Sequence, residues 1–274
     1  MCFFNIIDAT PQSFIKALFP LTYSKWWFAS TYFVLYLLHP FLNILIKSSK
    51  QETMEKLLIL TVFCWSIIPT FTSSSYQSNN LLWFVTLYCI SAYIRIYGLN
   101  PKVTSKQYIG LFIFFVALLY TSSLIIMMVG MKVTVLEGKI FFFYGRQSIF
   151  VLIIAVTMFM VFRGLRIGCH KWINIVASTT FGVYLIHDNP DVRELIWSTF
   201  FKVSLYQNRN AFVICTICIV CVVFAICSII DMIRQVTIEK LFLSVVDKMF
   251  ERKSRTFTCF ENLIENKVFG KCKK

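Results

Sequence analysis

Seven apolar stretches, separated by short polar segments, dominate the sequence. A helix needs about 20 residues to cross the roughly 30 Å hydrocarbon core of a bilayer, and backbone polar groups in lipid must pair within the segment. We therefore predict an all-α fold, a polytopic membrane helix bundle of about seven transmembrane helices followed by a C-terminal amphipathic basic helix. The stretches cover residues 26–46, 57–71, 81–97, 108–131, 147–165, 172–187 and 211–230.

The composition requires the bilayer as solvent for most of the chain. Of the 274 residues, 58% are hydrophobic and 15% are charged, whereas soluble domains carry about 25% charged residues. The net charge of +14 would suggest nucleic acid in a soluble protein. Here the basic residues lie in loops and in the tail, which indicates cytoplasmic loops and contact with membrane lipids. We predict a multi-pass membrane protein that binds no nucleic acid.

The domain organisation follows from where the apolar stretches stop. Residues 1–235 are predicted to form one membrane domain and residues 236–274 a cytoplasmic, basic, amphipathic tail. The start of the chain lacks the charged and apolar pattern of a signal peptide. The short loops on the two sides carry similar numbers of Lys and Arg, so the basic tail decides the orientation. A tail inside the cell leaves the first residue outside.

The segment 178–190 ends an apolar helix on polar groups. Thr180, Tyr184 and His187 fall on one helical face, and Pro190 is expected to stop the helix. His187 and Asp188 then lie at a membrane boundary, where ionisable groups are functional candidates. The alternative is a polar cap where the helix meets water, and the residues by themselves leave both interpretations open.

Polar and sulfur-bearing residues inside the stretches are expected to pack. Cys215, Cys218 and Cys221 have the spacing CxxCxxC, but steps of three rotate by about 60° around a helix, so the thiols diverge. We therefore predict no metal site and no disulfide framework. Asn43 is predicted to hydrogen-bond to a neighbouring helix.

Three parts of the chain resemble one family. They are residues 16–43 (KALFPLTYSKWWFASTYFVLYLLHPFLN), residues 92–95 (AYIR) and residues 181–190 (FGVYLIHDNP). Their order and spacing are similar to those of the integral-membrane acyltransferase-3 family, bacterial O-acyltransferases that modify surface polysaccharides. The resemblance runs over essentially the whole chain.

The resemblance implies an acyl transfer at the outer face of a bacterial plasma membrane. Acetyl-CoA or another acyl-CoA would be the donor substrate, with no bound cofactor, and a surface polysaccharide or lipid-linked glycan the acceptor. His187 and Asp188 are the candidate catalytic residues, and Trp27 and Trp83 are expected to stack on sugar faces. The other residues expected to bind substrate are Lys25 and Tyr184.

Basic residues at the inner ends of two stretches are candidates for the acyl-CoA side. Arg95 and Arg166 carry guanidinium groups suited to the phosphates of CoA. Each also fits an arginine that only extends to the lipid headgroups or marks the cytoplasmic side. His39 is expected to be a helix-packing histidine.

The resemblance also shows a difference. Family members have about ten spans, and the first carries an arginine and the histidine taken as the catalytic base; no such pair precedes residue 26 here. We therefore expect an N-terminally truncated member, inactive alone, or one completed by a separate N-terminal fragment. Two other interpretations stay open, namely a transporter or flippase of a lipid-linked sugar and a non-enzymatic membrane remnant. A transporter predicts internal repeats, and none is visible.

Overall fold

The structure is a computed structural model of the chain and is helical wherever it has regular secondary structure in the described residues. It describes residues 15, 16, 18–72, 74, 76–99, 103–165, 168, 170–202 and 212–250. These residues divide into two compact units, one within Ala9–Gly168 and the other within Cys169–Lys274.

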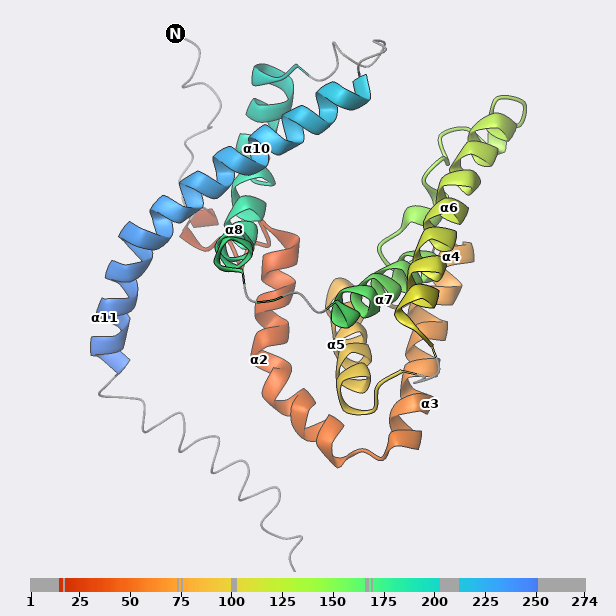
Figure 1. The fold of residues 1–274 in the computed structure, drawn as a ribbon, viewed down its shortest axis with the longest axis horizontal. Helices are drawn as coiled ribbons and strands as arrows, with labels where there is room; N and C mark the ends of the chain where they lie inside the picture. Colours follow the sequence, from red (N-terminus) through yellow and green to blue (C-terminus); the bar gives the residue numbers. More distant parts are fainter. Residues whose placement is uncertain are drawn as a thin grey trace, which may run out of the picture. The chain divides into compact units, whose positions relative to one another are not determined.

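The first unit is built from five long helical segments (Figure 1). Its hydrophobic core joins Ile46, Met54 and Cys89, and α6 packs along α7. The elements are α2 (Trp27–Ser48), α3 (Gln51–Val62), a π-helical turn (Phe63–Ile67), α4 (Ile68–Thr72), α5 (Asn80–Ile96), α6 (Ser105–Gly130), two 3₁₀ turns (Thr134–Leu136 and Phe142–Tyr144) and α7 (Ile149–Gly164).

The second unit pairs two long helices. Val183 of one packs against Val223 and Cys227 of the other. Trp197 and Phe201 from the short connection cover the same core. The elements are α8 (Lys171–His187), α9 (Pro190–Glu194), a π-helical turn (Leu195–Phe200), α10 (Phe212–Arg234), a second π-helical turn (Gln235–Glu239) and α11 (Lys240–Phe250).

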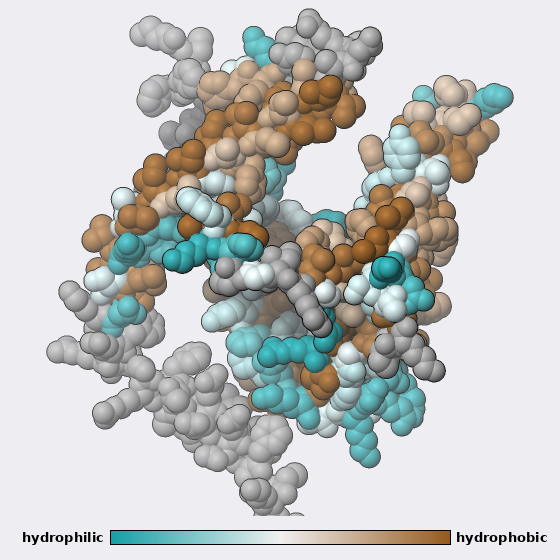
Figure 2. Space-filling view, viewed as in Figure 1, coloured by the Kyte–Doolittle hydropathy of each residue, from teal (hydrophilic) through white to brown (hydrophobic). Residues whose placement is uncertain are grey.

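The predicted helical membrane bundle is confirmed. Four helical segments in the described part of the chain are long and apolar enough to cross a bilayer, namely Trp27–Ser48, Gln51–Thr72, Ser105–Gly130 and Phe212–Asp247. Two shorter apolar helices, α5 and α7, match two further predicted stretches. The sixth predicted stretch, 172–187, matches α8, which has 17 residues. Apolar side chains cover the outside of α6 and α10 (Figure 2), as expected for helices that face lipid.

The second predicted stretch starts earlier than its apolar residues suggest. We predicted a loop over 47–56, but α3 begins at Gln51, so Lys56 lies within a helix. Its ammonium forms an ion pair of 2.7 Å with Glu52, one turn earlier. Such i, i+4 pairs support exposed helical turns, and Glu52 suits the positive end of the helix.

A proline explains the π-helical turn that joins α3 to α4. Pro69 has no N–H, and its ring would clash with the carbonyl four residues earlier in a regular α-helix. The turn Phe63–Ile67 widens the helix just ahead of it, where the Ile68 N–H donates to the carbonyl of Phe63. The wider turn accommodates the ring, so the chain continues as one helical segment to Thr72.

The last predicted stretch ends later than residue 230. α10 continues through Asp231 to Arg234, and the helical path extends to Phe250. Asp231 is the first residue after that predicted stretch, and it is 1% exposed. Its carboxylate accepts hydrogen bonds from Arg234 Nε at 2.7 Å and Gln235 Nε2 at 2.8 Å. Both donors come from the next turn of the same helical path, so the buried carboxylate is paired and the helix continues past it.

Candidate functional site: an aromatic and polar pocket

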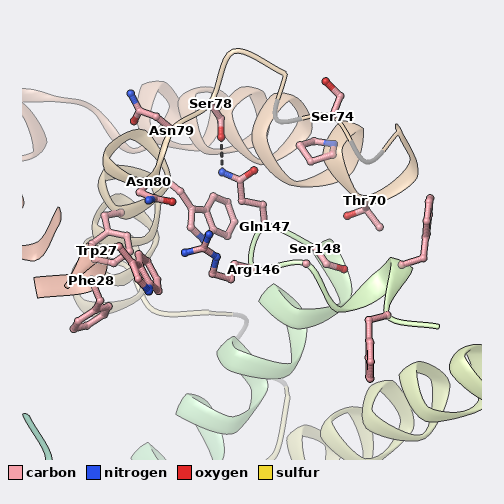
Figure 3. A pocket seen from close by; sticks show the side chains of 16 residues that line it. Trp27, Phe28, Thr70, Ser74, Ser78, Asn79, Asn80, Arg146, Gln147 and Ser148 are labelled. Atoms are coloured by element: carbon pink, nitrogen blue, oxygen red, sulfur yellow. Dashed lines mark hydrogen bonds between the residues drawn. The ribbon is translucent and has the colours of Figure 1, made fainter. Parts of the chain in front are cut away.

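A pocket of about 600 Å³ lies at one end of the first unit (Figure 3). It is formed by the first residues of α2 and α5, the end of α4, and the segment that leads into α7. These parts meet because α2, α5 and α7 all begin at this end of the unit, whereas α4 ends there. The lining residues are Trp27, Phe28, Pro69, Thr70, Ser74, Ser78, Asn79, Asn80, Trp83, Phe84, Phe141, Phe142, Gly145, Arg146, Gln147 and Ser148.

Aromatic rings form one wall of the pocket. Phe84 lies edge-on to both Trp27 and Phe28, with ring centroids 6.4 Å and 5.5 Å apart. Trp83 is 6% exposed, so it forms part of the rigid lining, whereas Trp27 is 37% exposed. The edge-on contacts fix the orientation of the Trp27 indole.

Amide and hydroxyl side chains form the rest of the lining. Asn79 caps α5, since its Oδ1 accepts from the Leu82 N–H at 2.9 Å. The Gln147 side-chain amide donates to the Ser78 hydroxyl (Figure 3), which ties the residues just before α5 to the segment before α7. Asn80 contributes a further amide.

Arg146 brings a positive charge into the pocket. The carbon of its guanidinium lies 4.1 Å from the centroid of the Trp27 ring. This is a close cation–π contact, and Figure 3 shows the guanidinium beside the indole. The contact joins two residues from opposite ends of the first unit's sequence.

Two buried hydroxyls hold the start of α7 against α4. Ser66 Oγ donates to the Gln147 carbonyl at 2.7 Å, and the Ile149 N–H donates to Thr70 Oγ1 at 2.8 Å. Ser66 is 0% exposed and Thr70 is 3% exposed. Because both hydrogen bonds are shielded from water, they fix the backbone that presents Arg146 and Ser148 to the pocket.

The end of α8 in the second unit groups three of the predicted residues. The helix ends at His187, as Pro190 implied, and Pro190 begins α9. His187 Nδ1 lies 2.6 Å from the Val183 carbonyl oxygen, and the rings of Tyr184 and His187 have centroids 6.5 Å apart. Asp188 lies 3.5 Å from the guanidinium of Arg193.

Close packing against α10 fixes α8. A Cβ at Gly182 would overlap the carboxyl group of Asp231, which leaves room only for glycine. Thr179 Oγ1 donates to Ser228 Oγ at 3.2 Å, and Gln235 Nε2 donates to the Ser178 carbonyl at 3.1 Å. Small residues and interhelical hydrogen bonds of this kind are typical of helix pairs in membranes.

The opposite end of the first unit carries Arg95, one of the two basic residues predicted for the acyl-CoA side. Arg95 is exposed at the end of α5, and Arg163 donates to the neighbouring Ile94 carbonyl at 3.3 Å. Arg166 lies outside the described residues. Among the residues that the structure describes, no three His, Cys, Asp or Glu side chains are grouped so that they could hold a metal ion.

The structure brings some predicted residues together. Trp27 and Trp83 line one pocket, whereas the Lys25 ammonium lies 5.7 Å from the ring of Trp26. Asn43 accepts a hydrogen bond of 2.7 Å from Tyr88 on α5, which confirms its expected role in packing.

Sequence reasoning missed three groups, namely Arg146, Ser148 and Asp231. No role in a site was predicted for Arg146, which is one of the basic residues in the loops. An arginine placed directly before the polar start of an apolar stretch was the available signal for it. For Asp231, the available signal was an acidic residue one turn before Arg234 and Gln235, within helical reach of both.

Comparison with known proteins agrees with the resemblance. A family model described as an acyltransferase domain matches residues 3–232, which is most of the chain. No curated protein and no solved structure matches it. Together with the apolar helices, this match shows that the chain is a membrane protein of the acyltransferase-3 family.

Proposed function

We propose that the protein is an O-acyltransferase of the bacterial plasma membrane that transfers an acetyl group from acetyl-CoA to a hydroxyl of a cell-surface polysaccharide. The family match supports acyl transfer. The observation that carries the choice of acceptor is the pocket in which two tryptophans lie beside amide and hydroxyl side chains.

The pocket suits a sugar ring because a sugar has two kinds of surface. Its C–H groups form an apolar face, which can cover the exposed indole of Trp27, while the buried Trp83 supports this wall of the pocket. Its hydroxyls surround that face and need both donors and acceptors, which the amides of Asn80 and Gln147 supply. The volume of about 600 Å³ lies within the range of small-molecule sites.

His187 is our candidate for the general base. A carbonyl oxygen can only accept, so the bond to Val183 requires a proton on Nδ1, and the lone pair of Nε2 is then free to take another. In the proposed step the acceptor hydroxyl oxygen bonds to the thioester carbon while its proton passes to Nε2. The carbon–sulfur bond then breaks, and CoA leaves as a thiolate that takes up a proton. Asp188, the next residue along the chain, is proposed as the second catalytic residue.

The donor side is proposed for the opposite end of the first unit. Arg95, exposed at the end of α5, has the planar donors that suit phosphate oxygens. Arg166 is proposed for the same role. Phosphate-bearing CoA would therefore approach from the cytoplasm, where it is made, and the glycan from the other side.

The proposal is tested by acetyl transfer in the host's own membranes, where a separate N-terminal fragment would accompany the full chain. Labelled acetyl-CoA and isolated polysaccharide should give a base-labile ester on the polysaccharide. Trp27→Ala removes one aromatic surface, and we expect the KM for the acceptor to rise about threefold to tenfold. The matched control is Trp172→Ala, because Trp172 is 79% exposed and lies outside the pocket. Absence of labelled ester, or equal effects of the two substitutions, would contradict the proposal.

A further inference from the structure

We propose that the pocket selects a negatively charged acceptor and that Arg146 is the residue that binds its anionic group. The ligand would be a sugar that carries a carboxylate or a phosphate. The inference rests on the proposed function, since it assumes that this pocket is the acceptor site, and it adds the chemical class of the acceptor.

The charge of the pocket is positive and uncompensated. Among the described residues that line it, Arg146 is the only charged side chain, and none is acidic. The guanidinium is exposed and is held over Trp27 at 4.1 Å. An aromatic ring stabilises a cation but does not neutralise it. The guanidinium donors that do not face the ring therefore suit an anionic oxygen from a ligand.

Helix ends add to this positive potential. The first residues of α2 and α5 and the N-cap residue of α7, Ser148, line the pocket. Each helix N-terminus carries roughly half a positive charge. The end of α4 contributes the opposite sign, so three positive ends face one negative end. Each of the three helices has several turns of aligned peptide dipoles, since α2 has 22 residues, α5 has 17 and α7 has 16.

A buried hydroxyl provides a separate observation. Ser148 lines the pocket at the N-cap position of α7 and is 3% exposed. Its Oγ makes no hydrogen bond to another residue that the structure describes, and it does not cap its own helix. A buried hydroxyl without a partner is costly. The Oγ atom is itself shielded from water, so a turn about its χ1 toward the pocket would let it donate to an oxygen of a bound ligand at the same helix end.

The positive character extends beyond the pocket. A second hollow of about 510 Å³ shares Phe141 and Phe142 with it and is lined by Lys139. Lys139 is exposed. Two basic residues therefore lie along two adjoining hollows, which fits a chain of sugars with more than one charge better than a single anion.

The aromatic wall favours an anionic sugar over the headgroup of an anionic lipid. A headgroup phosphate needs only donors and a positive charge, which Arg146 and the helix ends provide. Trp27 and Trp83 would have no role for such a ligand. A charged sugar uses both features, because its ring covers an indole while its carboxylate or phosphate meets the guanidinium.

The test compares two disaccharides that differ by one charge. The full chain in phosphatidylcholine nanodiscs is titrated with glucosyl-glucose and with glucuronosyl-glucose, and binding is followed by ligand-observed NMR. We expect the acidic sugar to bind about fivefold to tenfold more tightly. Arg146→Gln should abolish this preference and leave the affinity for the neutral sugar unchanged, whereas Arg146→Lys should keep part of it. Lys132→Gln is the matched control, since Lys132 is exposed and lines neither hollow.

Several results would overturn the inference. One is equal affinity for the two sugars, and another is a preference for the acidic sugar that survives Arg146→Gln. A third is an equal fall in affinity for both sugars in that variant, which would mean that Arg146 only supports Trp27. Loss of the preference when phosphatidylglycerol is added would assign the charge site to a lipid headgroup. Acetyl transfer is measured separately: a chain that transfers acetyl groups but binds both sugars equally loses this inference and keeps the proposed function.

Discussion

His187 on α8 and His39 on α2 make a similar local contact, in which the ring Nδ1 lies beside a backbone carbonyl one turn earlier in the same helix. His187 Nδ1 lies 2.6 Å from the Val183 carbonyl, and His39 Nδ1 lies 2.7 Å from the Tyr36 carbonyl. Both side chains are half-buried. They differ in their neighbours, because Asp188 follows His187, whereas Pro40 follows His39. The proposed catalytic role of His187 and the predicted packing role of His39 can therefore be compared in two similar local settings.

Replacement of His187 by alanine should lower acetyl transfer without loss of expression. A missing general base typically costs about 10²-fold to 10⁴-fold in rate. His39→Ala removes an equivalent hydrogen bond on α2 and should leave the rate close to that of the parent chain. The measurement is the initial rate of labelled acetyl transfer, normalised to the amount of chain in the membrane. Similar rates in the two variants would remove His187 from the chemistry.

Helices α8 and α10 approach each other closely at Gly182 and Asp231. Asp231 is buried and fully occupied by Arg234 and Gln235, so its carboxylate has little freedom to move. Gly182 lies directly against it and has no side chain to displace it. The element that carries Tyr184 and His187 is thus oriented by a glycine on one helix and a carboxylate on the other.

Gly182→Ala should therefore destabilise the second unit. The new methyl group would overlap the Asp231 carboxyl group, and overpacking of this kind costs about 1–3 kcal/mol. The measurement is the thermal unfolding midpoint of the chain in detergent. Gly110→Ala on α6 is the matched control, because a Cβ there meets nothing within 4 Å, and alanine is the better helix former by about 1 kcal/mol.

A double substitution tests the cause of that effect. If the clash with Asp231 is responsible, Asp231→Ala should remove most of the additional cost of Gly182→Ala, so the two changes should be strongly non-additive. Additive effects would show that Gly182 matters for another reason.

The first unit as a whole has two ends of different character. The pocket end gathers the starts of α2, α5 and α7. The other end joins the start of α3 to the end of α5, since the Tyr93 hydroxyl donates to Glu55 at 2.6 Å. It also joins the start of α6 to the end of α7, where Ser105 lies against Gly164. A membrane around this unit would leave the two ends on opposite sides.

Cysteine labelling tests this arrangement. Ser74→Cys and Lys139→Cys lie at the pocket end, and Ser49→Cys lies in the turn before α3 at the other end. A membrane-impermeant maleimide added to intact cells should label the first two and not the third, which should react only after permeabilisation. Mass spectrometry of the labelled peptides separates these sites from the native cysteines. Labelling of all three in intact cells would contradict the proposed orientation.

The local features of this protein were predictable from its sequence. Apolar stretches must become helices in lipid because their backbone groups have no other partner, so the helical bundle followed from composition and length. Pro190 ended α8 at His187 for a reason contained in neighbouring residues. The family followed from short motifs at the two ends of the chain. That Trp27 and Trp83 line one pocket agrees with their predicted joint role, but that role stays a prediction.

Only the tertiary structure decided the contacts between distant residues. Arg146 lies over Trp27 because α2 and α7 start at the same end of the first unit. The Asp231 side chain on α10 is buried against α8 because Gly182 has no side chain and leaves space for it. Hydrophobic periodicity reports which residues face lipid or the core. It carries no information on which helix end meets which, and the positive pocket is built from helix ends.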